Sequence, residues 1–344
     1  MAKIKIGGAV LTLVALMFLG IVIFGGMTYY IYAVKGSVLK TGSVNMPTGA
    51  SVSEQALILK EQGFLKDTSD FCALSRRFKY VKARPGHYTL TKGMTFRGLI
   101  GRLRVGNQTP VKLTFNNIRT VERLAGAISK CIEADSLTML NTLRNPDMAA
   151  LYGFGKSDII SMFIPDTYQV YWTITPEELM ARMNKEYERF WSARGRDDKR
   201  KKLNLSRKEV STLASIVVEE SKYAPEQPRI AGVYLNRLRK KMPLQADPTV
   251  KYALGDPSIK RILFKHLEVN SPYNTYKHTG LPPGPIYCPP ISAIDAVLDY
   301  EKHNYLYFCA APDLSGRHRF ATTLTQHNAN AREYAKALDK AGIR

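Results

Sequence analysis

Two adjacent glutamates, Glu219 and Glu220, stand at the end of a segment with a strong helical pattern. The helix begins at a capping box, because Ser206 and Glu209 have the spacing at which each side chain bonds the backbone N–H of the other residue. At about 100° per residue, the apolar residues that follow form one stripe: Val210, Leu213, Ile216 and Val217. Glu220 falls within this stripe, whereas Glu219 points to a different side of the helix.

The two glutamates are therefore predicted to have different environments. We expect Glu219 to be solvated and ordinary, and Glu220 to be partly buried at the end of an apolar face. Burial disfavours a charged carboxylate and raises its pKa, which keeps a proton available for general-acid cleavage of a glycosidic bond. The helix alone leaves a second interpretation open, in which Glu220 is a buried carboxylate paired with a basic residue such as Arg237.

The loops after this helix combine polar and aromatic side chains with stiff Pro- and Gly-rich backbone. After a second helix over 229–239 come the segments 244–255, 272–276 and 280–286. Aromatic faces pack on pyranose rings, while amides and hydroxyls bond sugar hydroxyls, so this composition suits a sugar polymer. The alternative, that Pro and Gly merely mark turns, explains those residues but not the clustering of polar ones.

The N-terminus carries an apolar segment long enough to cross a membrane. Residues 6–34 have no charge, and roughly 20 apolar residues span a bilayer. A cleaved signal peptide would have a shorter apolar core of about 7–15 residues, so we expect an uncleaved anchor over 6–34. The numbers of basic residues on its two sides are nearly equal, so charge hardly decides the orientation. We expect residues 1–5 in the cytoplasm, the anchor in the cytoplasmic (inner) membrane and the body in the periplasm. A short polar stem is expected over 35–43.

Composition is that of a globular protein with a strongly basic surface. The 344 residues are 45% apolar and 23% charged, with a net charge of +21. Charge alone favours a polyanion, nucleic acid first, but the anchor and the lack of a nucleic-acid-binding motif argue against that partner. The four cysteines have no metal-binding spacing; we expect free thiols, with a Cys288–Cys309 bridge as the alternative outside the cytoplasm.

Between the anchor and the glutamates the chain divides into two parts. Over 44–132 a short β-like run, a Ser or Thr, and a helical segment recur three times, with helices expected over 52–62, 96–103 and 121–132. This rhythm suits a small α/β module that binds a glycan or a partner, or a plain packing domain. From residue 146 to 203 the pattern is helical, and we interpret the charge run 194–202 as a solvated loop.

The chain resembles the MltG-type endolytic murein transglycosylases, the YceG-like family. The resemblance runs from the anchor to nearly the C-terminus, and five motifs in the right order carry most of it: AlaSerIleValValGluGluSer (214–221), LeuAsnArgLeu (235–238), LeuGlnAlaAspProThrVal (244–250), TyrAsnThrTyr (273–276) and GlyLeuProProGlyProIle (280–286). ProAspThrTyr at 165–168 fits as well.

The resemblance implies an α+β chain with a single transmembrane helix, a LysM-like module over 44–132 and a catalytic domain over 146–344 with a lysozyme-like helical element. It implies endolytic, lytic cleavage of the MurNAc–GlcNAc bond, which gives 1,6-anhydro-MurNAc ends, needs no metal or cofactor and ends the elongation of nascent strands. The partners that it implies are peptidoglycan glycan strands, the cytoplasmic membrane and cell-wall synthases. The family's catalytic Glu precedes a Ser or Thr, which selects Glu220. The candidates for substrate binding are Ser221, Gln245, Asp247, Thr249, Tyr252, Asn274 and Tyr276.

Two departures from the family pattern qualify the resemblance. The usual ThrIleProGluGly of the middle strand is ThrPheAsnAsnIle at 114–118, which weakens the case for glycan binding by the first module. The catalytic helix of the family often shows Glu-x-Glu, and Val218 replaces the first of these acids here. A second acid on that turn is therefore not required.

Two other functions compete with lytic cleavage. A hydrolytic muramidase needs a second carboxylate, and Asp247 is the candidate. Its Gln-x-Asp-Pro setting favours a structural role instead, in which the Asp side chain bonds its own backbone and shapes the loop. The third function is a non-catalytic scaffold that binds glycan near the cell-wall synthesis machinery.

Overall fold

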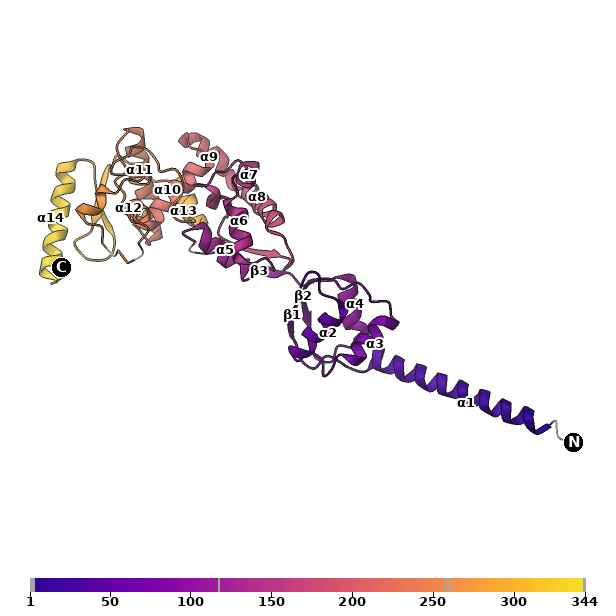
Figure 1. The fold of residues 1–344 in the computed structure, drawn as a ribbon. Coiled ribbons are helices and arrows are strands. Elements are labelled where there is room, and N and C mark those ends of the chain that lie inside the picture. The colour runs from indigo at the N-terminus through magenta and orange to yellow at the C-terminus, as the bar shows by residue number, and fades with distance from the viewer. Residues whose placement is uncertain (1–3, 117, 257, 260, 343–344) are drawn as a thin grey trace. The chain divides into compact units, whose positions relative to one another are not determined.

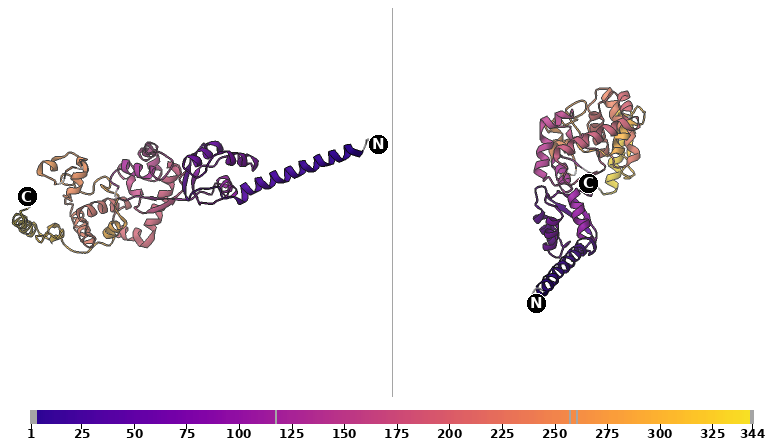
Figure 2. Two further views of the ribbon diagram at one scale, coloured as in Figure 1. Left: turned by 90° about the horizontal axis from the view of Figure 1, so that it is seen from below. Right: turned by 90° about the vertical axis from the view of Figure 1, so that its right-hand side faces the viewer.

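The computed structural model describes residues 4–342 except 117, 257 and 260, so position 117 of the departing segment 114–118 lies outside the described residues. The chain forms two compact units (Figures 1 and 2). The first comprises Met1–Lys112 with Cys131–Glu133 and Gln169–Ile174, and the second comprises Leu113–Lys130, Ala134–Tyr168 and Thr175–Arg344. Both mix helices with two-stranded sheets, as an α+β chain should.

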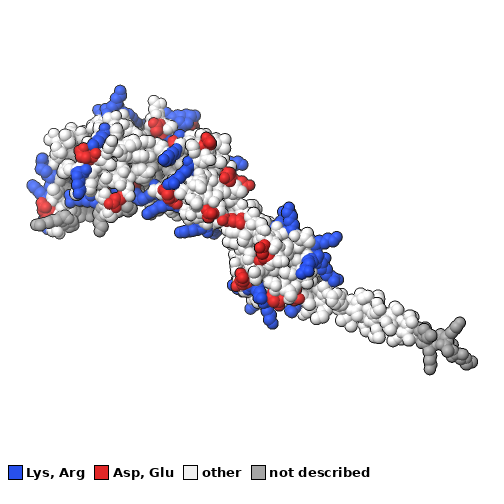
Figure 3. Space-filling model, in the orientation of Figure 1, with Lys and Arg blue, Asp and Glu red and all other residues white. Residues whose placement is uncertain are grey.

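The apolar N-terminus forms one long helix, α1 (Ile4–Tyr29), which a π-helical turn, η1 (Tyr30–Val34), continues. Residues Ala9–Val34 have a mean hydropathy of 2.6, and none of the most apolar stretch is buried. In Figure 3 the stretch Ala9–Val34 is white, because none of its residues is charged. Length and composition thus allow it to cross a membrane.

The expected stem over 35–43 does not exist as a free linker. The backbone N–H groups of Ser37 and Val38 donate to Met94 O at 2.9 and 3.1 Å, and that of Leu39 donates to Phe64 O at 2.9 Å. Val38 is 2% exposed, and Tyr32 stacks on Phe78 with 3.8 Å between ring centroids. The polar composition of the segment concealed these contacts, which bind the end of α1 directly to the first unit.

The first unit is built on an antiparallel pair of strands, β1 (Gly42–Met46) and β2 (Gly86–Leu90), with Val44 opposite Tyr88. Between and after the strands come α2 (Val52–Glu61), α3 (Ser69–Arg77) and α4 (Phe96–Val105). The side chains of Ser51 and Thr95 cap α2 and α4, as the spacing predicts. One apolar core joins the strands to these helices.

A second two-stranded sheet pairs β3 (Val111–Thr114) with β4 (Thr167–Val170). The helices of this region carry local start signals: the Thr120 side chain caps α5, and Thr175 with Glu178 forms a capping box ahead of Pro176. Its helical elements are α5 (Val121–Ser129), α6 (Ser136–Arg144), α7 (Pro146–Leu151), η2 (Ile159–Met162) and α8 (Pro176–Ser192).

Helix α10 (Arg207–Glu220) is the centre of the second unit. It starts at the predicted capping box, and its residues from Val210 to Val218 are all buried. The predicted apolar stripe is confirmed, but the burial extends around the whole helix because neighbours cover every side. These neighbours include α9 (Arg196–Leu203), α11 (Gln227–Arg239), α12 (Asp247–Leu254) and α13 (Ile291–Leu298).

The C-terminal part completes the second unit with a hairpin and a long helix. Strands β5 (Tyr307–Ala310) and β6 (His318–Ala321) pair antiparallel, and α14 (Leu324–Lys340) packs against them. Three short 3₁₀ turns connect elements of the second unit: η3 (Ala193–Gly195), η4 (Ala224–Glu226) and η5 (Phe264–Glu268). All four cysteines are free thiols, so the Cys288–Cys309 alternative is wrong.

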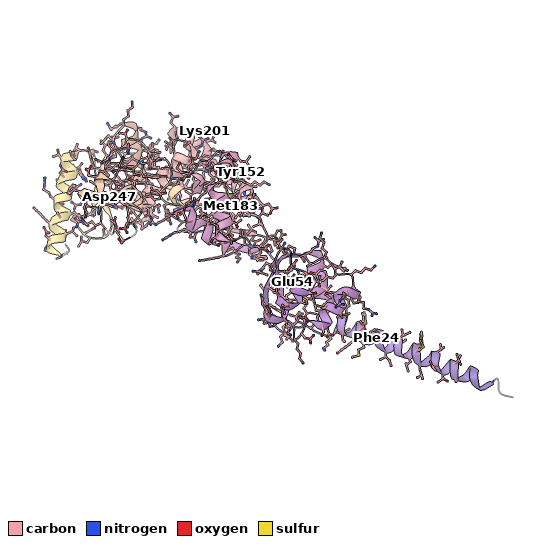
Figure 4. All side chains as sticks on the ribbon, in the orientation of Figure 1. Phe24, Glu54, Tyr152, Met183, Lys201 and Asp247 are labelled. Carbon is pink, nitrogen blue, oxygen red and sulfur yellow. The ribbon has the colours of Figure 1, made fainter. Side chains whose placement is uncertain are left out.

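The interpretation of the charge run 194–202 as a solvated loop is wrong, because most of it forms α9. Arg196 is 4% exposed, lies over the Phe190 ring and donates to both carboxylate oxygens of Asp295 on α13 at 2.7 and 3.0 Å. Other charges of this helix remain at the surface, such as Lys201, labelled in Figure 4. Tertiary partners thus order a segment whose composition alone indicates solvent.

We predict that Arg196→Ala lowers the free energy of unfolding of the second unit by about 2–4 kcal/mol, because it removes a buried guanidinium and strands a partly buried carboxylate. Lys201→Ala in the same helix is the matched control and should change stability by less than about 0.5 kcal/mol. Urea unfolding of the full chain in detergent, followed by tryptophan fluorescence, measures both. Equal stabilities of the two variants would contradict this role of Arg196.

Candidate active site at the end of a buried helix

Glu220 is the last residue of α10, and the chain leaves the helix at Ser221, whose backbone is extended with φ −138°. The Ser221 hydroxyl accepts the Tyr223 N–H at 3.2 Å, and its carbonyl accepts the Gln227 side-chain amide at 3.0 Å. Ser221 is 3% exposed. The structure therefore places this substrate-binding candidate inside the turn that ends the helix, where it fixes the position of Glu220.

The Glu220 carboxyl is partly buried and has one direct side-chain partner. The Tyr234 hydroxyl, on α11, donates to Glu220 Oε1 at 2.7 Å. Burial raises the pKa of Glu220 to about 7; the Tyr234 hydrogen bond lowers it and the negative charge of Asp247 raises it further. A helix C-terminus is also the negative end of the helix dipole, which disfavours a carboxylate there. Glu220 can therefore hold a proton near neutral pH.

Arg237 does not form the buried ion pair with Glu220 that the sequence left open. Its guanidinium donates to three backbone carbonyls, those of Leu306, Leu244 and Pro243, at 2.7, 2.8 and 3.2 Å. It also donates to the side-chain oxygen of Gln245 at 3.2 Å. Among the ion pairs of the described residues, none joins Arg237 to Glu220. Its charge still lowers the pKa of Glu220, but less than burial raises it.

Glu219 is not solvated, so that part of the sequence prediction is wrong. Its side chain is 12% exposed and forms ion pairs with Arg119 at 2.6 Å and with Lys222 at 2.5 Å. Burial raises the pKa of Glu219, but hydrogen bonds from the two cations outweigh burial and hold the pKa below its usual value. The two glutamates thus differ in protonation as predicted. Burial is the predicted cause at Glu220, but at Glu219 the cause is its two cationic partners and not solvent.

Asp247 and Tyr276 form a second polar pair near Glu220. The Tyr276 hydroxyl donates to Asp247 Oδ1 at 2.6 Å. Asp247 is the first residue of α12 and is exposed, and no hydrogen bond caps the helix through a side chain there. The expected bond from Asp247 to its own backbone is therefore replaced by a tyrosine from another loop. Figure 4 labels Asp247 in the second unit.

Gln245 stands in the same loop in a strained backbone conformation. Its φ is +52°, in the left-handed region that side chains other than glycine seldom adopt. The loop is held there because the Gln245 N–H donates to Thr275 O at 3.0 Å and the side chain accepts from Arg237. Gln245 is exposed. Its amide nitrogen is thus available to a ligand beside Asp247.

Thr249 and Asn274 lie beneath the loops, since both are 0% exposed. The Thr249 hydroxyl bonds Ala246 O at 2.7 Å and the Thr275 hydroxyl at 2.8 Å. The Asn274 amide donates to Leu267 O and Val269 O at 2.7 and 2.9 Å. We assign these two candidates to loop support, because neither can touch a ligand in this conformation.

Tyr252 belongs to a separate cavity of about 770 Å³ within the second unit. Its ring lies 4.7 Å from the Tyr273 ring, centroid to centroid. The motif 280–286 borders the cavity through Pro285. Gly284 is required there, because a Cβ at this position would lie 2.0 Å from Ser157 O. The close approach of these two backbones explains the Gly of the motif.

Tyr234 is the site residue that sequence reasoning missed. Its helical spacing with Ile230 and Val233 indicates a core position, and it is indeed 2% exposed. The available signal was the hydroxyl itself, since a buried tyrosine O–H needs a hydrogen-bond partner. Within the described residues, no three His, Cys, Asp or Glu side chains gather as metal ligands. Because burial raises the pKa of Glu220 to about 7, the site can exchange a proton there, beside the exposed residues Gln245 and Asp247.

Comparisons with known proteins relate the chain to one protein family and to murein transglycosylases. The YceG-like family profile matches residues 44–333. An endolytic murein transglycosylase of Bacillus subtilis is 33% identical over 87% of this chain and 86% of its own length. One from Streptococcus pneumoniae is 27% identical over 94% of this chain and 64% of its own length. A yceG-like protein crystal structure from Listeria monocytogenes has a TM-score of 0.54 at 29% identity, covering 85% of this chain and 99% of that one.

We predict that Tyr234→Phe raises the pKa of Glu220 above that of the wild type, because the lost hydrogen bond favours the charged carboxylate. Carbon-13 NMR of labelled glutamate carboxyls measures the titration, and Glu220→Gln identifies the resonance. Tyr152→Phe, after α7, is the control and should leave the midpoint in place. A midpoint unchanged in Tyr234→Phe would contradict the coupling.

A second prediction concerns stability against pH. A carboxyl with a raised folded pKa binds its proton more tightly in the folded state, so its contribution to stability falls as pH rises from about 4.5 to about 7. Glu220→Gln removes this loss, so the stability of the variant relative to the wild type should be greater at pH 8 than at pH 4 by about 3 kcal/mol. Thermal unfolding at both pH values measures it; a difference independent of pH would argue against the raised pKa.

Proposed function

This chain belongs to the YceG-like family, and we propose that it cleaves peptidoglycan glycan strands within their length by lytic transglycosylation, with Glu220 as the catalytic acid and base. The observation that carries the proposal is the carboxyl of Glu220, whose pKa burial raises to about 7 beside the exposed polar residues Gln245 and Asp247. Relatives named endolytic murein transglycosylase, one of them 33% identical, support the same reaction.

The reaction needs one group that first donates and then accepts a proton. Glu220 donates its proton to the oxygen of the MurNAc–GlcNAc bond, and the bond between that oxygen and muramyl C1 breaks. The muramyl C6 hydroxyl then forms a bond to C1 and loses its proton to the Glu220 carboxylate. The products are a free GlcNAc hydroxyl and a 1,6-anhydro-MurNAc end, no water is consumed, and Glu220 regains its proton.

The neighbours of Glu220 suit both halves of this cycle. Tyr234 holds the carboxyl at one oxygen and stabilises its charged form after the first transfer. Asp247, with Tyr276 bonded to it, contributes negative charge that raises the pKa of Glu220 and that would also stabilise a positive charge developing at C1. We assign Asp247 to this electrostatic role, and not to the activation of water.

We also propose how the rest of the chain serves this reaction. The helix over Ala9–Val34 would be a single membrane anchor with the body on the extracytoplasmic side. The order β1–α2–α3–β2 supports a LysM-like module in the region 44–132, and α10 would be the lysozyme-like element of a catalytic domain over 146–344. Cleavage at the membrane would end the growth of nascent strands, beside the cell-wall synthases.

We predict that Glu220→Gln lowers activity on isolated glycan strands by at least about a hundredfold, because it removes the only proton donor of the mechanism. Glu219→Gln is the matched control at the adjacent position and should keep activity within about tenfold of the wild type, since Glu219 serves ion pairs. Wild-type kcat/KM should fall as pH rises through about 7, where Glu220 loses its proton. A larger loss in Glu219→Gln than in Glu220→Gln would refute the assignment.

The type of reaction is tested by digestion in heavy-oxygen water. Lytic cleavage leaves the new muramyl ends unlabelled and one water lighter than hydrolytic ends, as measured by mass spectrometry. Asp247→Asn should lower the rate without changing this product. Labelled reducing ends would instead show a muramidase that uses Asp247, and glycan binding without new ends would show a scaffold.

A further inference from the structure

The cavity beside Tyr252 has a lining that the cleavage mechanism does not use. It measures about 770 Å³, within the range of small-ligand sites. The polar part of its wall includes Arg119, Arg144 and Lys156, and the aromatic part is the Tyr252–Tyr273 pair. All of these residues belong to the second unit.

The side chains around the cavity carry more positive than negative charges. Arg144 pairs with Glu122 at 2.5 Å, but this pair is exposed and weak. Arg119 and Lys222 both pair with one acid, Glu219, so one of their two positive charges is not neutralised. Lys156 is exposed, and its side chain has no ion pair among the described residues. Such a surface attracts a ligand with more than one carboxylate.

An ion pair and a helix connect the wall of the cavity to the proposed site. Arg119 on its wall reaches Glu219, the residue before Glu220, at 2.6 Å. Tyr252 lies on α12, the helix that begins at Asp247. Five residues of helix rise about 7.5 Å, so the cavity starts little more than one helical turn from Asp247. A substituent of the sugar at the cleavage point can therefore enter it.

We propose that this cavity binds the peptide stem of the muramyl residue that is cleaved, through the carboxylates of the stem. The inference rests on the proposed function and names the substrate feature that the enzyme would select. Where a stem is attached, the lactyl carboxyl of MurNAc is an amide and the N-acetylated glycan backbone is uncharged, so cations have no partner on it. The stem leaves the lactyl group of each MurNAc and carries free carboxylates, which Lys156, Arg144 and Arg119 would meet, while the two tyrosines pack on its aliphatic parts.

Binding is measured first, because it does not depend on turnover. The full-length Glu220→Gln protein in detergent is titrated calorimetrically with an N-acetylmuramyl tripeptide that has free carboxylates. Its amidated form and the stem-free GlcNAc–MurNAc disaccharide with its lactyl carboxyl amidated are the uncharged comparison ligands. We expect the charged tripeptide to bind at least about tenfold more tightly than either, with affinity that falls as salt rises. Equal affinities of the three ligands would overturn the proposal.

The residue test uses Lys156→Met, which removes the charge but keeps most of the side chain. We expect it to lower affinity for the charged tripeptide about tenfold, and Lys156→Arg to restore most of it. Lys201→Met, on α9, is the matched control and should bind as the parent does. If Lys156→Met binds the charged tripeptide as tightly as Lys201→Met, the assignment of the cavity is wrong.

Turnover then separates this inference from the proposed function. Wild type and Lys156→Met are compared on strands with and without peptide stems. The ratio of kcat/KM for the two substrates should favour stem-bearing strands and should fall about tenfold in the variant, mainly through KM. Inactivity of the wild type on both substrates would refute the cleavage proposal while the calorimetric result still decides whether the stem is bound.

Discussion

The hydrogen bond from the Tyr234 hydroxyl to Glu220 joins the end of α10 to the middle of α11, and the chemistry of the site depends on it. Nine consecutive buried residues of α10 bring the carboxyl into the interior, where a charge without a partner is costly. The Tyr234 hydroxyl gives the carboxyl a hydrogen bond but, being neutral, does not keep the carboxyl ionised as a cationic partner would. This combination allows Glu220 to hold a proton near neutral pH and still carry a charge for part of a reaction cycle.

The adjacent residue shows how strongly the partner decides the behaviour of a buried acid. Glu219 follows Val218 on the same helix and is only 12% exposed, yet two cations keep it ionised. The same ion pairs attach Arg119 to the end of α10 and place its charge on the wall of the neighbouring cavity. A structural ion pair next to Glu220 thus also shapes the surface that, under our proposal, a charged substituent of the substrate would meet.

Several residues expected to contact substrate support the loops instead. Thr249 and Asn274 lie fully buried under the segments that present Gln245 and Tyr276. Arg237 serves a similar end, since its guanidinium satisfies three backbone carbonyls that would otherwise be buried without donors. A surface of irregular loops needs such internal donors, because no helix or sheet pairs its backbone groups.

Local physics was readable from the sequence alone. The capping box at Ser206, the caps at Ser51, Thr95 and Thr120, and the apolar N-terminal helix involve only residues a few positions apart, and the preference for Glu220 over Glu219 followed from helical spacing. The sequence also carried the family motifs. Only the tertiary structure decided which groups face these acids: Tyr234, the cations around Glu219, Tyr276 on Asp247 and the buried charge of α9. These contacts join residues from different elements. Helical periodicity predicts that a side chain is buried, but it does not predict which side chains of other elements contact it.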